Sequence, residues 1–201
     1  MTNLVRCKLC GYIMDAALVK DTCPACGYSA KMFEPYVDRV EPYRRRILDL
    51  DIHPIIVHAP QALTFILLLL VPLSRVLPAA WTDHLHKAIT VMGLLLPPTI
   101  IGTYLSGLLD GKMRFMKLAT PMLRNKMTGG ILFLLCSLAM AYFTTFTAWQ
   151  TGRSFLMLNI VNVLAFCCSM WLGTIGVRLM QSIFIKLGPA KPAAQPVKSA
   201  P

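Results

Sequence analysis

Four long stretches of the chain carry no charged side chain. The stretches are residues 52–74, 88–109, 127–152 and 154–177. Each is long enough for the roughly 20 residues that a membrane-spanning helix needs. The pattern therefore predicts an all-α membrane protein, in which residues 53–187 form a bundle of four transmembrane helices at about 55–77, 88–109, 127–149 and 155–178.

The composition agrees with this prediction and excludes an ordinary soluble domain. Hydrophobic residues make up 56% of the 201 positions and charged residues 14%, and the mean hydropathy is +0.59; soluble domains average about 25% charged residues. Seven of the nine acidic residues precede His53, so the net charge of +11 comes from basic residues that flank and separate the apolar stretches. This arrangement favours membrane lipid as the partner of the basic segments and argues against nucleic acid.

The basic residues also predict the orientation in the membrane. They gather before the first stretch and between the second and third, at Arg39, Arg44, Arg45, Arg46, Lys112, Arg114, Lys117, Arg124 and Lys126. The other two loops hold only Arg75, Lys87 and Arg153. The positive-inside rule then predicts a multi-pass protein of the prokaryotic inner membrane with both termini in the cytoplasm. The Pro/Ala-rich tail at 188–201 cannot bury a core and is predicted to be disordered.

Two cysteine motifs near the N-terminus carry the strongest chemical signal. They are CKLCGY at 7–12 and CPACGY at 23–28. Each Cys-x-x-Cys turn brings two thiolates to one ion, and the spacer between the turns can fold back so that four sulfurs form a tetrahedron. Zinc and iron both accept such a site. The N-terminus has no apolar signal-peptide core, so the motifs are expected in the reducing cytoplasm, where metal binding is favoured over disulfides.

At these residues the chain resembles a known family. Residues 5–34 look like a rubredoxin domain, particularly the short form at the C-terminus of rubrerythrins, because they combine both Cys-x-x-Cys-Gly motifs with Lys31 and the closing Phe33-Glu34. In that family four cysteines hold one iron that carries a single electron. The resemblance implies a rubredoxin-like metal-binding domain at 1–34 with its ligands at Cys7, Cys10, Cys23 and Cys26. Met14 replaces an aromatic residue found in many rubredoxins, and the spacer has no tryptophan, so a zinc ribbon stays open as an alternative.

A second motif, DIHPIIVHAPQALTF at 51–65, places His53 and His58 where the basic segment becomes apolar. An ionisable residue at membrane depth is a functional candidate. The motif resembles the opening of a small, mostly uncharacterised family of four-helix bacterial membrane proteins, whose suspected kinship with di-haem cytochromes implies haem b. On a regular helix the two histidines point about 140° apart, so they cannot clamp one haem together. They are candidate ligands for haem or quinone. His84 and His86 are expected in a solvated loop.

Together these signals predict a membrane-anchored electron-transfer protein rather than an enzyme with its own substrate. An interfacial basic linker at 35–52 would hold the metal domain close to the helices. Electrons would pass from a redox partner protein to a membrane acceptor, which is haem b, quinone or a partner subunit. The chain is also a candidate for a homo- or hetero-oligomer. One alternative function is a zinc-ribbon membrane scaffold or assembly factor without redox activity. Another is a transporter of small solutes, for which the proline-interrupted helices are the pointer.

Overall fold

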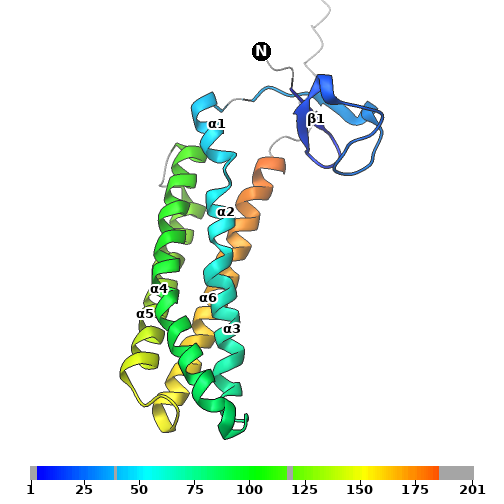
Figure 1. Cartoon of the computed structure of the whole chain (residues 1–201). Helices are drawn as coiled ribbons and strands as arrows, with labels where there is room; N and C mark the ends of the chain where they lie inside the picture. The colour runs from blue at the N-terminus through cyan, green and yellow to red at the C-terminus, as the bar shows by residue number, and fades with distance from the viewer. Residues whose placement is uncertain (1–3, 39, 117–119, 186–201) are drawn as a thin grey trace, which may run out of the picture. The chain divides into compact units, whose positions relative to one another are not determined.

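The computed structural model describes residues 4–38, 40–116 and 120–185. Arg39, Lys117 and the tail at 188–201 lie outside this part of the chain. The described residues form two compact units, one built on residues 4–46 and the other on residues 47–182. Figure 1 shows the small sheet of the first unit and the long helices of the second. The predicted class is confirmed: the protein is mostly helical, with four long apolar helices and a small N-terminal metal-binding domain.

A three-stranded antiparallel sheet organises the N-terminal unit. Its strands are β1 (Leu4–Cys7), β2 (Ile13–Asp15) and β3 (Phe33–Pro35), in the order β2-β1-β3. The register pairs Val5 with Met14 on one side of β1 and Cys7 with Phe33 on the other. This central strand therefore brings the first cysteine motif beside the closing segment that follows the second motif.

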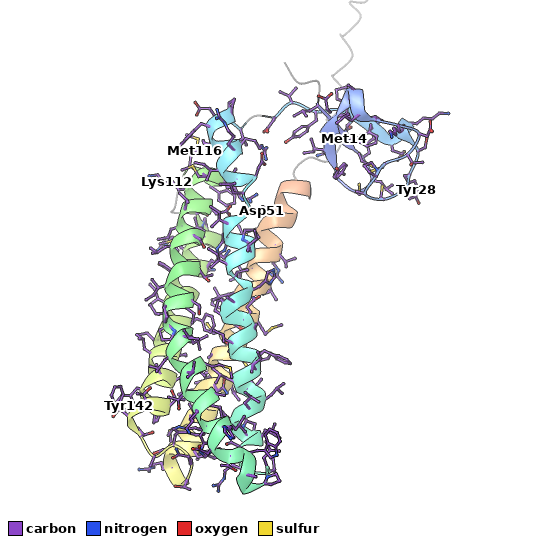
Figure 2. All side chains as sticks on the ribbon, in the orientation of Figure 1. Met14, Tyr28, Asp51, Lys112, Met116 and Tyr142 are labelled. Atoms are coloured by element: carbon purple, nitrogen blue, oxygen red, sulfur yellow. The ribbon has the colours of Figure 1, made fainter. Side chains whose placement is uncertain are left out.

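Six helices follow the sheet. They are α1 (Pro42–Leu48), α2 (Ile52–Ile56), α3 (His58–Leu73), α4 (Ala79–Phe115), α5 (Pro121–Phe146) and α6 (Gly152–Ile185). The helix α1 lies inside the segment predicted as an interfacial linker. Figure 2 labels Asp51, which adopts a left-handed conformation (φ 46°) between α1 and α2, and Met116 (φ 56°), which ends α4. The next helix, α5, begins with Pro121 after Thr120, whose hydroxyl oxygen accepts the N–H of Leu123.

The core of the bundle lies between α3, α4, α5 and α6. Its fully buried members include Leu67 of α3, Leu96 of α4, Met140 of α5 and Leu158 of α6. The helix α4 packs against α2, α3 and α5. The helix α6 packs against α5, where the Cys168 thiol lies 3.3 Å from a backbone carbonyl of α5, and it contacts α3 through the ring pair of Phe65 and Phe166. The four long helices therefore share one core.

Most of the apolar surface of this bundle faces outward. Four segments are long and apolar enough to cross a membrane: Pro42–Leu73, Ala80–Phe115, Pro121–Phe146 and Gly152–Leu179. The best 18-residue window of each has a mean hydropathy of 1.6 to 2.0, yet only 22% to 28% of each window is buried inside the chain. Soluble proteins rarely expose apolar surface on this scale, whereas lipid covers it without cost. The structure is consistent with a multi-pass membrane protein.

The second long helix begins earlier than the charge pattern predicts. The helix α4 begins at Ala79 rather than at 88, so His84 and His86 lie on a helix and the predicted solvated loop is wrong for them. An ion pair between Asp83 and Lys87, one helical turn apart at 2.7 Å, stabilises these polar turns. The imidazole of His86 also packs edge-on against the indole of buried Trp149, with ring centroids 4.8 Å apart. Polar residues can therefore extend a membrane helix beyond its apolar stretch.

Candidate metal centre

The two cysteine motifs fold into matching turns. In the first, Gly11 donates its N–H to the Cys7 carbonyl at 2.9 Å, and Cys7 donates its N–H to the Tyr12 carbonyl at 2.8 Å. In the second, Gly27 and Cys23 make the equivalent pair at 2.8 Å, and Cys23 donates to Tyr28 at 2.6 Å. The Cys-x-x-Cys-Gly-Tyr sequence thus specifies the same local fold twice.

Both turns depend on a glycine. Gly11 has a φ of 77° and Gly27 a φ of 73°, in the left-handed region that side chains with a Cβ rarely adopt. Each glycine follows the second cysteine of its motif and reverses the chain there. The cysteines of one turn consequently point to the same side and can reach one ion.

The four cysteine sulfurs predicted to bind metal lie together. All of them are within 4.8 Å of one another, with 3.8 Å between the Sγ atoms of Cys7 and Cys26 and 3.7 Å between those of Cys10 and Cys23. A tetrahedron with metal–sulfur bonds of about 2.3 Å has sulfur–sulfur edges of about 3.8 Å. The residues present therefore fit a single tetrahedral ion, with Cys7, Cys10, Cys23 and Cys26 as its ligands.

Backbone N–H groups favour the thiolate form of the first cysteine in each motif, whereas the pKa values of the second cysteines, Cys10 and Cys26, are raised by burial and by their neighbouring thiols. The N–H of Cys10, followed by that of Leu9, lowers the pKa of Cys7 to about 7 although burial acts in the opposite direction. Burial also opposes ionisation of Cys23, but the N–H groups of Cys26 and Ala25 outweigh it and lower its pKa. The same backbone positions act in both turns. N–H groups aimed at sulfur orient the ligands and tune a bound metal.

The site is buried on one side and open on the other. Cys7 and Cys23, the first cysteines of the two motifs, are 0% and 1% exposed, whereas Cys10 is exposed. Beside Cys10 the apolar side chains of Leu9 and Tyr12 are 52% and 43% exposed. A bound metal would therefore lie close to the protein surface on the side of Cys10.

An ion pair connects two neighbouring strands of the sheet in the metal-binding unit. The guanidinium Nη2 of Arg6 on β1 donates to Glu34 Oε1 on β3 at 2.9 Å. The Arg6 side chain is only 9% exposed, and the two residues are direct cross-strand partners. The pair joins the two segments that carry the first motif and the closing Phe33-Glu34.

Comparison with known protein families agrees with this geometry. Residues 6–34 match the family model described as rubrerythrin, rubredoxin-like domain. The predicted rubredoxin-like domain is thereby confirmed, and its four-cysteine site is one for iron or zinc. No curated protein and no solved structure matches the chain. The family match does not extend to the helices, so the predicted four-helix membrane family remains a resemblance.

Of the two candidate histidines, only His53 enters the bundle. Its Nδ1 lies 3.2 Å from Ser106 Oγ on α4, and its Nε2 lies 3.0 Å from Lys126 Nζ on α5. The Ser106 hydroxyl donates its own hydrogen to the Thr103 carbonyl, so its oxygen must accept from His53. The proton of the neutral imidazole is therefore on Nδ1, and Nε2 accepts from the Lys126 ammonium.

This arrangement does not support the predicted haem. Both ring nitrogens of His53 are engaged, which leaves no lone pair for iron. His58 is exposed at the start of α3 and is not brought beside His53 by any contact among the described residues. A turn at Val57 separates the two histidines, since α2 ends at Ile56 and α3 begins at His58.

Sequence reasoning missed Lys126 as a partner of His53. It counted Lys126 only as a positive charge in a loop, whereas Lys126 lies within the second turn of α5 and is only partly exposed. The one available signal was its position: α5 begins at Pro121, so a side chain at 126 is already inside the helix. Its contact with residue 53 could not be read from local patterns.

The His53–Lys126 contact predicts a specific effect on stability. Replacing His53 with leucine leaves the Lys126 ammonium without its imidazole acceptor in a partly buried site, so we expect a loss of about 1–3 kcal/mol. His58→Leu is the matched control, because exposed His58 makes no contact of this kind with the described residues. Thermal unfolding in detergent should show a lower midpoint for His53→Leu alone. Equal midpoints for the two variants would contradict the prediction.

Proposed function

We propose that this protein is a membrane-anchored electron carrier. The rubredoxin-like domain would hold one iron through Cys7, Cys10, Cys23 and Cys26, and iron held by four thiolates carries one electron as it changes between Fe(II) and Fe(III). The helices would anchor this domain in the prokaryotic inner membrane with both termini in the cytoplasm. Electrons would pass from a soluble redox protein to a membrane acceptor, either a quinone or a partner subunit.

The open side of the four-cysteine site is the observation that carries this proposal. Electron exchange needs a short path between the metal and its partner, and exposed Cys10 supplies one. Exposed Leu9 and Tyr12 provide apolar contact area beside it, while Lys8 and Lys20 in the same unit supply positive charge for an acidic partner. A purely structural zinc site does not need an exposed ligand beside apolar residues.

The short connection to the membrane supports the same proposal. Only residues 36–51 separate the last strand of the metal-binding unit from α2, and Asp38 pairs with Arg45 of α1 within this segment. A connection of this length keeps the metal site at high effective concentration near a membrane acceptor. An electron carrier benefits from such confinement.

A visible spectrum with metal analysis on the detergent-purified protein tests the proposed function. We expect one iron per chain, a coloured oxidised form and loss of the colour after dithionite, because iron held by four cysteines is reducible. Protein loaded with zinc serves as the colourless control. Purified protein that contains one zinc per chain, and that gains no reducible chromophore after iron reconstitution, would instead favour a zinc-ribbon scaffold.

A further inference from the structure

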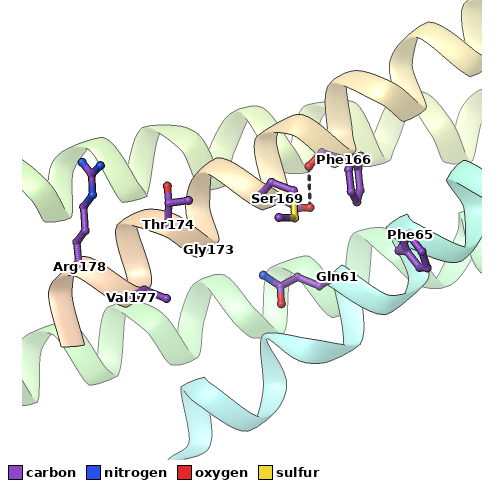
Figure 3. Close-up of a pocket in the computed structure, with 9 residues that line it drawn as sticks. Gln61, Phe65, Phe166, Ser169, Gly173, Thr174, Val177 and Arg178 are labelled. Carbon is purple, nitrogen blue, oxygen red and sulfur yellow. Dashed lines mark hydrogen bonds between the residues drawn. The ribbon is translucent and has the colours of Figure 1, made fainter. Parts of the chain in front are cut away.

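A groove runs between α3 and α6 within the helical bundle. It encloses about 760 Å³, and Figure 3 shows its lining. Gln61 and Phe65 come from α3, and Phe166, Gly173, Thr174 and Arg178 come from α6. The rings of Phe65 and Phe166 lie at one end with centroids 6.2 Å apart, and Arg178 stands at the other end. The groove thus has an aromatic end and a cationic end.

The lining offers hydrogen-bond donors without any acidic group. Arg178 is its one charged residue among those described, and the Gln61 amide lies between it and the aromatic end of the groove (Figure 3). The hydroxyls of Ser169 and Thr174 donate to the carbonyls of Phe166 and Trp171, at 2.9 Å and 2.7 Å. The donors left for a ligand are therefore those of Gln61 and Arg178. They suit acceptor oxygens on an otherwise apolar molecule.

Two glycines of α6 let polar side chains approach its backbone. A Cβ at Gly173 would lie 3.5 Å from Gln61 Nε2, and a Cβ at Gly176 would lie 4.0 Å from Lys126 Nζ. Gln61 of α3 and Lys126 of α5 consequently reach neighbouring positions on the same turn of α6. Of these two side chains, Gln61 lines the groove together with Arg178, whereas Lys126 is held by His53.

We propose that this groove binds a prenylated quinone, with its carbonyl-bearing ring toward Gln61 and Arg178 and its apolar chain along Phe65 and Phe166. This inference rests on the proposed function, because it names the membrane acceptor. A neutral amide and one guanidinium match a neutral ring with carbonyl oxygens, and the aromatic end gives the chain apolar contacts. Phe65 is 49% exposed, so a ligand dissolved in the bilayer can enter from the lipid side.

The electron count is consistent with this partner. Reduction of one quinone to its quinol consumes two electrons and two protons. One iron held by Cys7, Cys10, Cys23 and Cys26 would supply these electrons singly, with Fe(II) as the reductant, and the protons would come from water at the membrane surface. Two successive deliveries therefore complete the reaction, and a soluble donor protein must reduce the iron between them.

Quinone binding can be measured directly. The full-length protein in phosphatidylcholine nanodiscs is equilibrated with decylubiquinone, and the bound quinone is extracted and quantified. We expect saturable binding of one quinone per chain, weakened about tenfold or more by Gly173→Leu, which fills the groove, and clearly weakened by Gln61→Leu, which removes a donor. Gly102→Leu on α4 is the matched control, because a Cβ at Gly102 would meet no neighbouring atom of the described residues within 4 Å. It should bind like the wild type.

Three outcomes would overturn this inference. The first is no saturable binding, and the second is binding that is unchanged in both Gly173→Leu and Gln61→Leu. The third is stoichiometric displacement of the quinone by phosphatidylglycerol, which would make the groove a site for anionic lipid. Thermal unfolding of each variant separates loss of the groove from loss of the fold. Binding is measured with zinc-loaded as well as iron-loaded protein. Quinone binding without a reducible iron would refute the proposed function alone, and a reducible iron without quinone binding would refute this inference alone.

Discussion

Replacing Cys23 with serine is expected to remove the metal from the four-cysteine site and unfold the rubredoxin-like domain. Cys23 is 1% exposed and its Sγ lies 3.7 Å from that of Cys10, so a shorter hydroxyl cannot take its place as a thiolate ligand. A domain of about 30 residues cannot bury enough apolar surface to fold alone. Structural zinc contributes about 10–16 kcal/mol to comparable small domains. Loss of one ligand therefore removes most of the stabilising free energy.

The measurement for Cys23→Ser is the metal-to-protein ratio, together with proteolysis of the N-terminal segment. We expect the ratio to fall from one to near zero and residues 4–38 to become sensitive to protease. Cys167→Ser is the matched control, since Cys167 is an exposed cysteine of α6 outside the cluster. Its metal content should match that of the wild type. Full metal occupancy in Cys23→Ser would exclude the assigned ligand set.

Replacing Gly129 with leucine is expected to disrupt the contact between α5 and α6. A Cβ at this position would lie 2.7 Å from Trp171 Cζ3 and 2.9 Å from Leu172 Cδ2. These distances are shorter than van der Waals contacts, so the side chains of Trp171 and Leu172 must be displaced, or the helices must separate, to admit a leucine. Overpacking of a well-packed core costs about 1–3 kcal/mol and more where the backbone must move. We expect about 3 kcal/mol or more here, seen as a lower thermal midpoint in detergent.

Gly102→Leu distinguishes a steric effect from a general intolerance of larger residues. Gly102 also lies inside a long apolar helix, but within the described part of the chain its Cβ position has no neighbour closer than 4 Å. The substitution should leave the midpoint unchanged or raise it, because glycine is a poor helix former. If both variants lose the same stability, the close packing at Gly129 is not the cause.

Local sequence was sufficient to predict the metal site. The four ligands fall within residues 7–26, and each half of the site is specified by one six-residue motif with its own glycine. The hydrogen bonds of Cys7 and Cys23 to Tyr12 and Tyr28 span only five residues. Short-range rules of turn geometry therefore carry most of the information. The long helices were also predictable, because a bilayer imposes an uncharged stretch of fixed minimum length.

Contacts between distant segments could not be predicted in this way. His53 meets Lys126 across 73 positions, and the groove depends on how α3 and α6 pack. The early start of α4 was missed for a related reason. Charge gaps mark where a helix is apolar, whereas the turns around Asp83 and Lys87 are helical through a local ion pair and the packing of His86 on Trp149. The distribution of charged and apolar residues along the chain does not predict any of these side-chain contacts.

The order of the elements along the chain also bears on biosynthesis. All four ligands and the closing strand β3 precede Ile52, where the first helix of the bundle begins. Chains fold from the N-terminus as they leave the ribosome, and contacts within some 30 residues form quickly. The four-cysteine site can therefore be complete before the apolar helices reach the insertion machinery. Metal loading would then be a cotranslational event, and a shortage of iron during synthesis would determine which metal the mature protein carries.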